Sequence, residues 1–389
     1  MRIAFFGSSL VSAYWNGAAT YYRGIIRALN DLGFRVTFFE PDAYGRQQNR
    51  DLKTDPDWAR VVVYPGEGVD GVSRVLDQAA DYDVVVKASG VGVFDELLER
   101  EVVARRKAHQ TLIFWDVDAP ATLERMRNDA NDPFRAVVGQ YDLVFTYGGG
   151  DPVVREYESF GARECIPIYN ALDPSTHHPV PRNPNFEADL SFLGNRLPDR
   201  EARVDEFFFR AAALLPGSRL LLGGAGWDDK AKPESVRYIG HVFTEDHNAF
   251  NCTPRAVLNI SRDSMARNGW SPATRVFEAA GAAACLITDA WEGIDAFLEP
   301  EREVLVAHDG AEVAQIVRGL EPARAHAVGQ AALQRVLAEH TYAHRARQVA
   351  KILGGRLPVP GRNGKVEQHD AVPTGNRPPA TPPSATSTP

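Results

Sequence analysis

Residues 268–281 combine helix signals with charged side chains whose spacing suits a phosphorylated ligand. Ser271 can cap a helix, Pro272 suits the first helical position, and Gly281 suits a left-handed exit. This pattern predicts a short helix that leads into a buried strand over residues 282–288. Because the first turn of a helix leaves backbone N–H groups free at the positive end of the dipole, it favours an anion such as a nucleotide diphosphate.

Two charged side chains of this predicted helix are spaced to contact a nucleotide. Glu278 lies about two turns into the helix, where its carboxylate can accept hydrogen bonds from a pair of ribose hydroxyls. Arg275, one turn earlier, can bind phosphate. The alternative is an i,i+3 ion pair between the two side chains on the helix surface. The elements around the helix decide between these interpretations.

Length and composition favour two domains. A chain of 389 residues is too long for one typical core, and 44% of its residues are hydrophobic. The net charge of -8 argues against a nucleic-acid-binding surface but leaves room for a local basic cleft. Cys165, Cys252 and Cys285 are far apart and lack CxxC spacing, which favours buried, reduced thiols in a cytoplasmic protein. No apolar run reaches the ~20 residues of a membrane span, so we expect a soluble protein with no transmembrane segment.

Strand-like apolar runs alternate with helix-like stretches through the first half of the chain. The helical pattern over residues 18–32 is one example, and Gly33 follows at its exit. This alternation is typical of a parallel sheet with helices on both faces. The expected strands cover residues 3–6, 36–39, 60–64, 83–87, 111–115 and 143–146.

A second block of the same type follows a proline-rich connector at residues 179–184. Two similar α/β units joined by a linker form a cleft in which a bound ligand is shielded from water. Helical patterns then cover residues 311–320, 325–339 and 342–353. The strands expected in this half cover residues 189–193, 219–222, 256–260, 284–287 and 304–306.

Loops that follow parallel strands are the expected ligand-binding segments, because ligands bind beyond the carboxyl ends of such strands. The first such loop contains Gly7 and continues to Asn16 and Gly17, small residues that let a ligand or a facing domain approach the backbone. Two further loops, at residues 88–92 and 147–151, are rich in glycine.

The loop after the strand at residues 111–115 carries two carboxylates, Asp116 and Asp118. Either one suits a general base or a group that binds sugar hydroxyls. The alternative is that one carboxylate caps the helix beginning near Ala121 while the other is solvated. The adjacent pair His177 and His178 lacks metal-ligand spacing and is interpreted as solvated loop histidines.

The second domain has basic residues and glycines in the loops that follow its first two expected strands. Gly194, Asn195 and Arg200 follow its first strand, and an arginine there can bind phosphate oxygens in a bidentate manner. Gly224 lies in a glycine-rich turn after the next strand, where missing side chains leave room for a nucleotide base.

Taken together, residues 1 to about 353 resemble a two-domain glycosyltransferase of the GT-B architecture. The resemblance is in particular to the CgeB-type spore-maturation glycosyltransferases, which are related to glycosyltransferase family 4. It implies an α/β fold of two Rossmann-like domains that face each other across a cleft. The segments that carry the resemblance are residues 115–120, 169–174, 189–195 and 271–279 with the strand that follows.

The resemblance also implies roles for individual residues. Glu278 matches the second glutamate of the family 4 Glu-x7-Glu element, which binds the donor ribose, and Arg200 falls where those enzymes place a lysine for the donor diphosphate. The loop from Trp270 to Thr274, which includes Ser271, is expected to contact the phosphates. One departure is Trp270, which occupies the position of the first glutamate, the residue that usually touches the donor sugar. The identity of the sugar and the retaining mechanism of family 4 therefore do not carry over directly.

The predicted activity is transfer of a sugar from a UDP- or GDP-sugar to a hydroxyl of a glycan, protein or lipid-linked acceptor, without an essential metal or other cofactor. The rivals are a nucleotide-sugar epimerase and a non-catalytic relative that binds glycans or partner proteins. The expected acceptor-side domain covers residues 1–175 and the donor domain covers residues 185–338. A helix at residues 339–354 is expected to pack back on the first domain. Residues 355–389 are expected to form a disordered tail.

Overall fold

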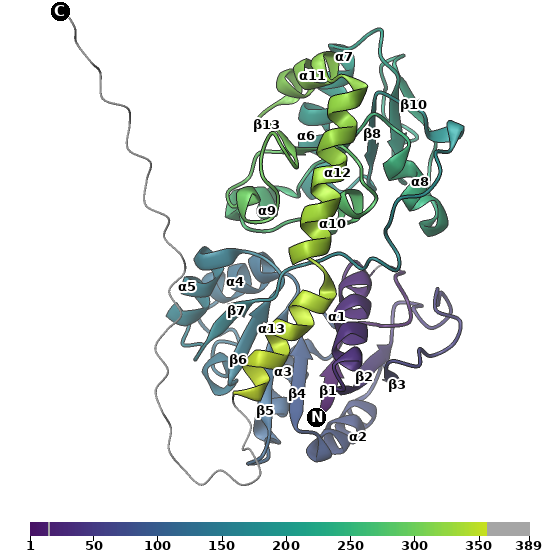
Figure 1. The fold of residues 1–389 in the computed structure, drawn as a ribbon. Helices are drawn as coiled ribbons and strands as arrows, with labels where there is room; N and C mark the ends of the chain where they lie inside the picture. Colours follow the sequence, from purple (N-terminus) through teal and green to yellow (C-terminus); the bar gives the residue numbers. More distant parts are fainter. Residues whose placement is uncertain (15, 356–389) are drawn as a thin grey trace, which may run out of the picture.

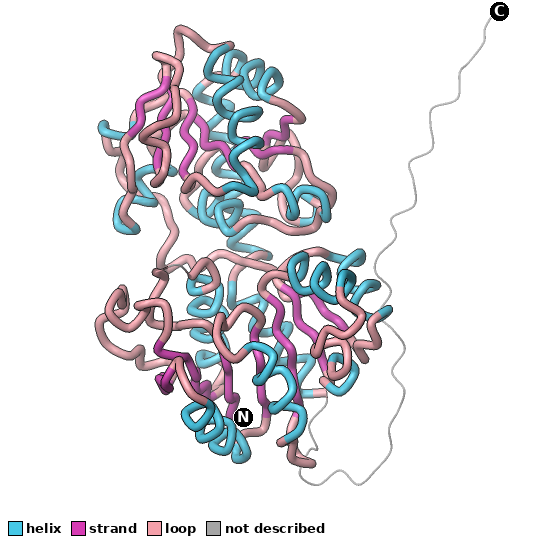
Figure 2. Tube along the Cα trace, turned by 180° about the vertical axis from the view of Figure 1, so that it is seen from behind, coloured by secondary structure: helices cyan, strands magenta, loops and turns pink. Residues whose placement is uncertain are grey.

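The computed structural model describes residues 1–14 and 16–355 of the chain. These residues form two α/β domains, one above the other in Figure 1, and Figure 2 shows the same two lobes from behind. Each domain is built on a parallel sheet with helices against its faces, so the predicted fold class is confirmed. The predicted tail, residues 355–389, lies outside the described residues except for Gly355.

The N-terminal domain holds a seven-stranded parallel sheet in the order β3-β2-β1-β4-β5-β6-β7. Every strand expected in this half is present. The sequence missed β7, because a strand of 3 residues is too short to show an alternating pattern. The strands are β1 (Arg2–Phe6), β2 (Arg35–Asp42), β3 (Arg60–Pro65), β4 (Val84–Ala88), β5 (Thr111–Asp116), β6 (Leu143–Thr146) and β7 (Cys165–Pro167).

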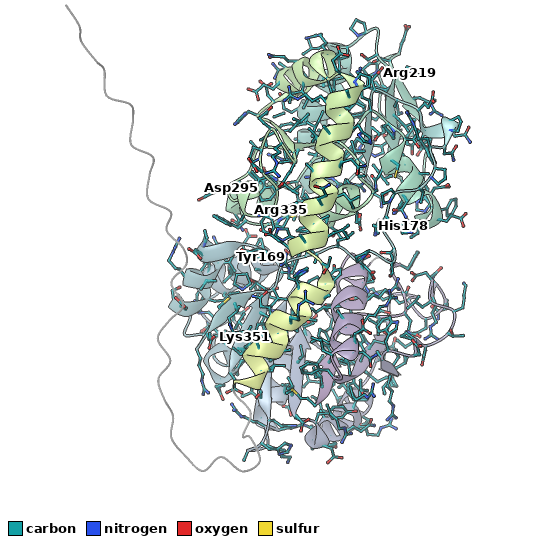
Figure 3. All side chains as sticks on the ribbon, in the orientation of Figure 1. Tyr169, His178, Arg219, Asp295, Arg335 and Lys351 are labelled. Atoms are coloured by element: carbon teal, nitrogen blue, oxygen red, sulfur yellow. The ribbon has the colours of Figure 1, made fainter. Side chains whose placement is uncertain are left out.

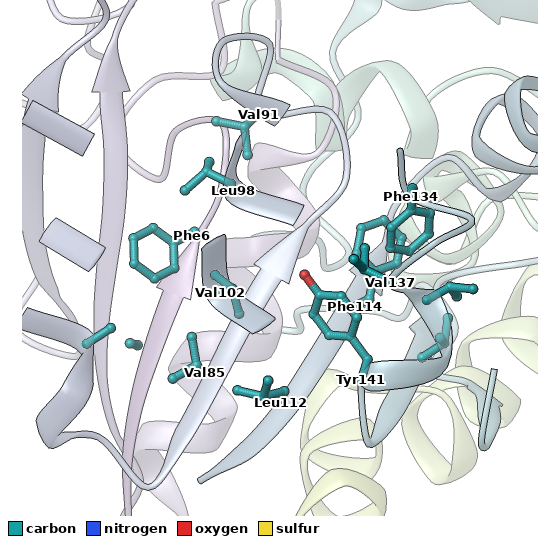
Figure 4. Packing of buried hydrophobic residues seen from close by; sticks show 14 of the residues in the cluster. Phe6, Val85, Val91, Leu98, Val102, Leu112, Phe114, Phe134, Val137 and Tyr141 are labelled. Carbon is teal, nitrogen blue, oxygen red and sulfur yellow. The ribbon is translucent and has the colours of Figure 1, made fainter. Parts of the chain in front are cut away.

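Both faces of this sheet are buried, which is why its strands are apolar along their whole length. Phe6 lies on the face covered by α2 to α5, while Phe5 lies on the opposite face under α1 and α13. Figure 4 shows Phe6 and Val85 of the sheet beside Leu98 and Val102 of α3. The helices are α1 (Ala19–Asp31), α2 (Val69–Gln78), α3 (Asp95–Ala104), α4 (Ala119–Asn128) and α5 (Gly150–Ser159).

The C-terminal domain holds a six-stranded parallel sheet in the order β10-β9-β8-β11-β12-β13. Its five expected strands are present, and the sequence missed β10, another strand of 3 residues. The strands are β8 (Leu190–Leu193), β9 (Leu220–Gly223), β10 (Val236–Tyr238), β11 (Ala256–Asn259), β12 (Leu286–Asp289) and β13 (Leu305–Ala307).

Helices of the second half cover this sheet and return to the first domain. None of the described helices combines the length and the apolar character needed to cross a membrane. The helices are α6 (Pro198–Val204), α7 (Arg210–Ala213), α8 (His247–Cys252), α9 (Asp263–Asn268), α10 (Thr274–Gly281), α11 (Gly310–Gly319), α12 (Pro322–Glu339) and α13 (Tyr342–Gly354).

The last two helices join the domains, as Figure 1 shows. Helix α12 packs on the C-terminal domain, where Val336 shares a core cluster with Phe277 of α10. Helix α13 packs beside α1 on the N-terminal domain, and the ring of Tyr342 meets that of Tyr21 with a centroid distance of 5.9 Å. The two domains are therefore linked by α12 and α13 as well as by the connector between them.

The connector that leaves β7 makes contacts with both domains. Tyr169 lies at the level where the two domains meet (Figure 3). Its ring packs against Phe297 of the C-terminal domain at a centroid distance of 4.9 Å, and its carbonyl accepts a hydrogen bond of 3.2 Å from Arg345 of α13. Asn170 donates a hydrogen bond of 3.3 Å to the carbonyl of Pro272, just before α10. These contacts fix the position of α10 relative to the N-terminal domain.

Candidate active site

A cavity of about 300 Å³ lies between the two domains, bordered by loops that follow strands of both sheets. The N-terminal domain contributes the loops after β1, β2, β4, β5 and β6, and the C-terminal domain contributes the loop after β11 and the start of α10. Because the strands of each sheet are parallel, their carboxyl ends lie at one edge and bring these loops together. Lining residues that bear on its chemistry are Asn16, Gly17, Arg46, Asp118, Tyr147, Arg262 and Thr274.

Helix α10 begins two residues later than the sequence predicted. Ala273 occupies the capping position in an extended conformation, and no side chain caps the helix, so the expected roles of Ser271 and Pro272 as cap and first helical residue are wrong. The reason is tertiary contact, because Ser271 packs against Gly148 of the N-terminal domain and the Pro272 carbonyl is bound by the connector. The uncapped start of α10 at Thr274 borders the cavity.

The exit of α10 also differs from the prediction. Gly281 is still helical, and Ala283 is the residue in the left-handed region, with φ of 58°. Glycine is required at position 281 by packing instead, because a Cβ there would lie 2.3 Å from Cδ1 of Leu172. The connector from the first domain therefore approaches the back of α10 closely.

Two arginines of the C-terminal domain interact electrostatically near the start of α10. Arg275 is on α10 and Arg200 is on α6, and burial lowers the pKa of both guanidinium groups. The nearby positive charge of Arg275 also contributes to lowering the pKa of Arg200, to about 10. Arg200 donates a hydrogen bond of 2.7 Å from Nη2 to the Asn195 carbonyl, while its buried Nε has no hydrogen-bond partner among the described residues. An anion between the two side chains would offset this repulsion.

Glu278 lies in a half-buried setting one turn beyond Arg275. Its side chain is 18% exposed, and Oε1 lies 3.9 Å from Nε2 of His177. In the described part of the chain no salt bridge joins Glu278 to Arg275, so the surface ion pair considered as the alternative is not formed. Burial lowers the pKa of the neighbouring His247, and the charge of Glu278 partly opposes that shift. The carboxylate is therefore held beside the start of α10 without a strong partner of its own.

The interpretation of the histidine pair was correct for one residue only. His178 is exposed, but His177 is buried beside Glu278, because the chain after Asp173 turns onto the C-terminal domain. Over residues 1–14 and 16–355, no group of three or more His, Cys, Asp or Glu side chains is arranged to hold a metal ion.

The structure gives Asp116 and Asp118 different environments. Asp116 is fully buried at the end of β5. Its Oδ1 accepts hydrogen bonds from the Ser89 hydroxyl at 2.6 Å and the Asp118 N–H at 2.9 Å, and its Oδ2 accepts one from the Tyr157 hydroxyl. These bonds occupy the carboxylate inside the domain and hold the loop in shape. The expectation that Asp116 faces an acceptor is therefore wrong.

Asp118 borders the cavity, with 46% of its side chain exposed. It occupies the position before α4, yet its carboxylate makes no capping hydrogen bond, so the alternative role as a helix cap is not realised. Burial raises the pKa of Asp118, and the positive charge of Arg262 partly opposes this shift. A carboxylate with a raised pKa is a stronger base, and this one is open to a substrate.

Three residues predicted to contact the donor, Gly194, Asn195 and Gly224, hold neighbouring loops together. Gly224 has φ of 116°, and a Cβ there would lie 2.2 Å from the Gly194 carbonyl oxygen. The space expected for a nucleotide base at Gly224 is therefore filled by the backbone of the loop after β8. Asn195 accepts a hydrogen bond of 2.9 Å from the Ala225 N–H. These contacts position Arg200, which follows on the same loop and helix.

The loop after β1 is also shaped by its own contacts. A Cβ on Gly7 would lie 2.4 Å from Cζ of Phe38, so this glycine makes room for the core rather than for a ligand. Asn16 lines the cavity, but its side chain accepts a hydrogen bond from the Ser8 hydroxyl at 2.9 Å and donates one to the Ser9 carbonyl at 2.8 Å. Gly17 is exposed at the cavity, as expected for close approach of a ligand.

Two arginines of the cavity were missed by the sequence reasoning. Arg262 follows β11, so the rule that loops after strands bind ligands was sufficient to find it. Arg46 comes from the loop after β2 and is 6% exposed, with hydrogen bonds to the carbonyls of Ser8 and Val91. No local signal marks it, because its burial depends on three loops that are distant in sequence.

The fold is shared with solved glycosyltransferase structures. The TM-score is 0.63 with HepE from Anabaena in complex with UDP-glucose and 0.66 with sucrose-phosphate synthase from Thermosynechococcus elongatus, each at 14% identity. With T4 phage BGT in complex with its UDP-glucose substrate the TM-score is 0.54 at 13% identity. These alignments cover 91%, 91% and 90% of this chain and 100%, 98% and 99% of the respective structures.

A sequence comparison gives a second, independent similarity. Residues 200–351, from α6 into α13, match the family model described as glycosyl transferase-like. No curated protein matches the chain by sequence. The described chain thus shares the fold of solved glycosyltransferases of the GT-B architecture, and its C-terminal part is similar in sequence to a glycosyl transferase-like family.

Proposed function

We propose that the protein transfers a sugar from a nucleoside diphosphate sugar, such as a UDP- or GDP-sugar, to a hydroxyl of a glycan, protein or lipid-linked acceptor. We further propose that it belongs with the CgeB-type enzymes related to glycosyltransferase family 4. The motif segments described above support this assignment. Structural relatives determined with UDP-glucose support the donor class.

One observation carries the proposal, namely the pair of half-buried arginines Arg200 and Arg275 near the start of α10. The positive charge of Arg275 acts on Arg200, and neither arginine forms a salt bridge with a carboxylate in the described part of the chain. A diphosphate between them would neutralise both charges and also accept hydrogen bonds from the free N–H groups of α10. We assign Glu278, one turn further along α10, to the two ribose hydroxyls.

The proposed reaction breaks the bond between the anomeric carbon of the donor sugar and the β-phosphate oxygen. The electron pair of that bond leaves with the nucleoside diphosphate, whose developing charge is stabilised by Arg200, Arg275 and α10. We assign this stabilisation to these groups rather than to a metal ion. The acceptor oxygen forms the new bond to the anomeric carbon, and its proton passes to Asp118, whose pKa is raised by burial.

The stereochemical outcome is part of the proposal. Retention of configuration, the outcome in family 4, requires the acceptor oxygen to attack the face of the sugar from which the diphosphate departs, whereas in-line attack from the opposite face inverts the anomeric carbon. Proton NMR of the product, through the coupling constant of the anomeric proton, distinguishes retention from inversion.

The test is a panel of UDP, GDP and their sugar derivatives in a thermal unfolding assay. A ligand that binds only the folded state stabilises it by about 2.7 kcal/mol at 100 times its dissociation constant. We expect one nucleotide class to raise Tm, and the matching sugar nucleotide to be consumed only when an acceptor is added. Turnover of the donor to another sugar nucleotide without acceptor would indicate an epimerase. No stabilisation by any member of the panel would refute the proposal.

A further inference from the structure

Trp270 forms a wedge between the two domains. Its backbone has φ of 48°, in the left-handed region that non-glycine residues rarely adopt. A Cβ on Gly150 of the N-terminal domain would lie 2.6 Å from Cγ of the indole, and a Cβ on Gly293 of the C-terminal domain would lie 2.3 Å from Cδ2. The indole therefore fits between two glycines that belong to opposite domains.

The backbone of Trp270 also makes hydrogen bonds to both domains. Its carbonyl accepts a hydrogen bond of 2.7 Å from the Gly149 N–H, across the domain boundary. Its own N–H donates one of 2.6 Å to the Glu292 carbonyl within the C-terminal domain. The next residue, Ser271, packs against Gly148. Ring and backbone thus hold the loop after β6 against the segment that leads into α10.

Trp270 is not an ordinary core residue. It is partly exposed and belongs to none of the five hydrophobic clusters found among the described residues. A strained backbone conformation persists only where surrounding contacts enforce it. Here those contacts come from the interface between the domains.

We propose that Trp270 is a positioning residue that sets the spacing between the donor side and the acceptor side of the cavity. On one side, its segment runs directly into α10, beside Arg275. On the other side, the loop it holds begins at Tyr147, which lines the cavity together with Asp118. The expected effect of Trp270 on the rate of sugar transfer rests on the function proposed above. The contact that Trp270 makes between the domains is independent of that function.

The first experiment measures the contact itself, by hydrogen–deuterium exchange of the peptide covering residues 147–151. In the wild type the Gly149 N–H is bonded to Trp270 and should be protected. Trp270→Ala should speed exchange in this peptide, and Trp270→Phe, which keeps an aromatic wedge, should restore protection. Unchanged exchange in Trp270→Ala would overturn the proposal, whatever the enzyme does.

The second experiment separates positioning from a loss of fold, using UDP affinity and transfer kinetics. The groups assigned to the nucleotide lie in the C-terminal domain, so Trp270→Ala should keep the Kd for UDP within about threefold of the wild-type value. Its kcat should fall by about 100-fold, since misplacement of reacting groups by 1 Å has an effect of that order. Trp270→Phe should recover most of the rate. A fall in UDP affinity as large as the fall in kcat would contradict a positioning role.

A matched pair of glycine variants tests the same contact from the other domain. Gly150, at the start of α5, and Gly161, just after it, both have positive φ, of 50° and 92°. A Cβ on Gly150 collides with the Trp270 ring, whereas a Cβ on Gly161 meets no atom within 4 Å. Gly150→Ala should reproduce the exchange and kcat changes of Trp270→Ala, and Gly161→Ala should show neither. If UDP does not bind the wild-type protein, the proposed function is refuted. The exchange results would still show whether Trp270 holds the two domains together.

Discussion

Nη1 of Arg262 lies 3.9 Å from Oδ2 of Asp118, so that a cation of the C-terminal domain faces the candidate base of the N-terminal domain across their boundary. Arg262 also binds Asp199 at 2.5 Å, and its charge is therefore shared. The balance between burial and this shared charge sets the pKa of Asp118. The catalytic role proposed for Asp118 thus depends on both domains.

Asp118→Asn should lower kcat by about 100-fold or more, because general base catalysis contributes 10²- to 10⁴-fold. The change is isosteric and lies outside the nucleotide site, so the Kd for UDP should stay within about threefold. Glu124→Gln is the control, since Glu124 is an exposed carboxylate further along α4. Steady-state kinetics and calorimetry measure both quantities. A fully active Asp118→Asn variant would remove Asp118 from the mechanism.

The pH dependence of kcat/KM should show a limb set by Asp118. Burial raises the pKa of this carboxyl above its ordinary value, so activity should fall with decreasing pH earlier than for an ordinary aspartate. The Arg262 charge opposes that shift, and Arg262→Gln should therefore move the limb to higher pH. A limb that moves to lower pH, or stays in place, would contradict the assignment.

Arg275→Ala should weaken UDP binding by about tenfold or more, because hydrogen bonds to charged groups contribute about 1.5–3 kcal/mol. The Tm of the ligand-free protein should not fall appreciably, since the positive charge of Arg275 acts unfavourably on that of Arg200. Differential scanning fluorimetry with and without UDP measures both effects. Arg267→Ala is the control, because that side chain is 74% exposed on α9. A large drop in Tm without UDP would instead indicate a structural arginine.

The role of Glu278 is testable through the ribose alone. Wild-type protein should bind UDP more tightly than 2′-deoxy-UDP, because the carboxylate accepts a hydrogen bond from the 2′-hydroxyl. In Glu278→Ala the affinity for UDP should fall while the affinity for 2′-deoxy-UDP changes little, so that the preference disappears. Calorimetric titration of both nucleotides into both proteins gives the four affinities of a thermodynamic cycle, from which the coupling between Glu278 and the 2′-hydroxyl is obtained. An undiminished preference in Glu278→Ala would assign ribose recognition to another residue.

His340, between α12 and α13, should make stability sensitive to acid. Burial, reinforced by the Arg345 charge, lowers its pKa from 6.5 to about 3, and its Nδ1 lies 3.0 Å from Arg345 Nη2. Because the unfolded state binds the proton more readily, stability is full above pH 6.5 and is lost as pH falls from there toward 3.

Urea unfolding at pH 7.5 and pH 5 measures this effect. His340→Asn should reduce the difference in unfolding free energy between the two conditions. The exposed control His109→Asn should leave it unchanged. An equal pH dependence in wild type and His340→Asn would show that other groups account for the acid sensitivity.

The fold was predictable from the sequence because its main signals are local. Runs such as residues 111–115 are apolar at every position, which fits strands buried on both faces. The start of α10 was not predictable, because Ser271 and Pro272 are good helix-start residues that are instead used in contacts with the N-terminal domain. Tertiary contact overrode local preference there.

The candidate site was predictable only in part, for a similar reason. Asp116 and Asp118 are equivalent in sequence, and only the packing of Tyr157 and Ser89 around Asp116 separates a buried structural carboxylate from an accessible one. Arg262 follows an expected strand, so the rule that loops after parallel strands bind ligands, which selected Asp118, could also have selected Arg262. The same rule did not single out Arg46, because the residues that surround Arg46 come from loops far apart along the chain.

A crystal structure of the protein with UDP would show whether the start of α10 binds the diphosphate of a nucleotide sugar. We expect the diphosphate within hydrogen-bond distance of the N–H groups at Thr274 and Arg275 and of the Arg200 guanidinium, with the ribose hydroxyls at Glu278. UDP bound elsewhere in the molecule, with these groups unoccupied, would contradict this expectation.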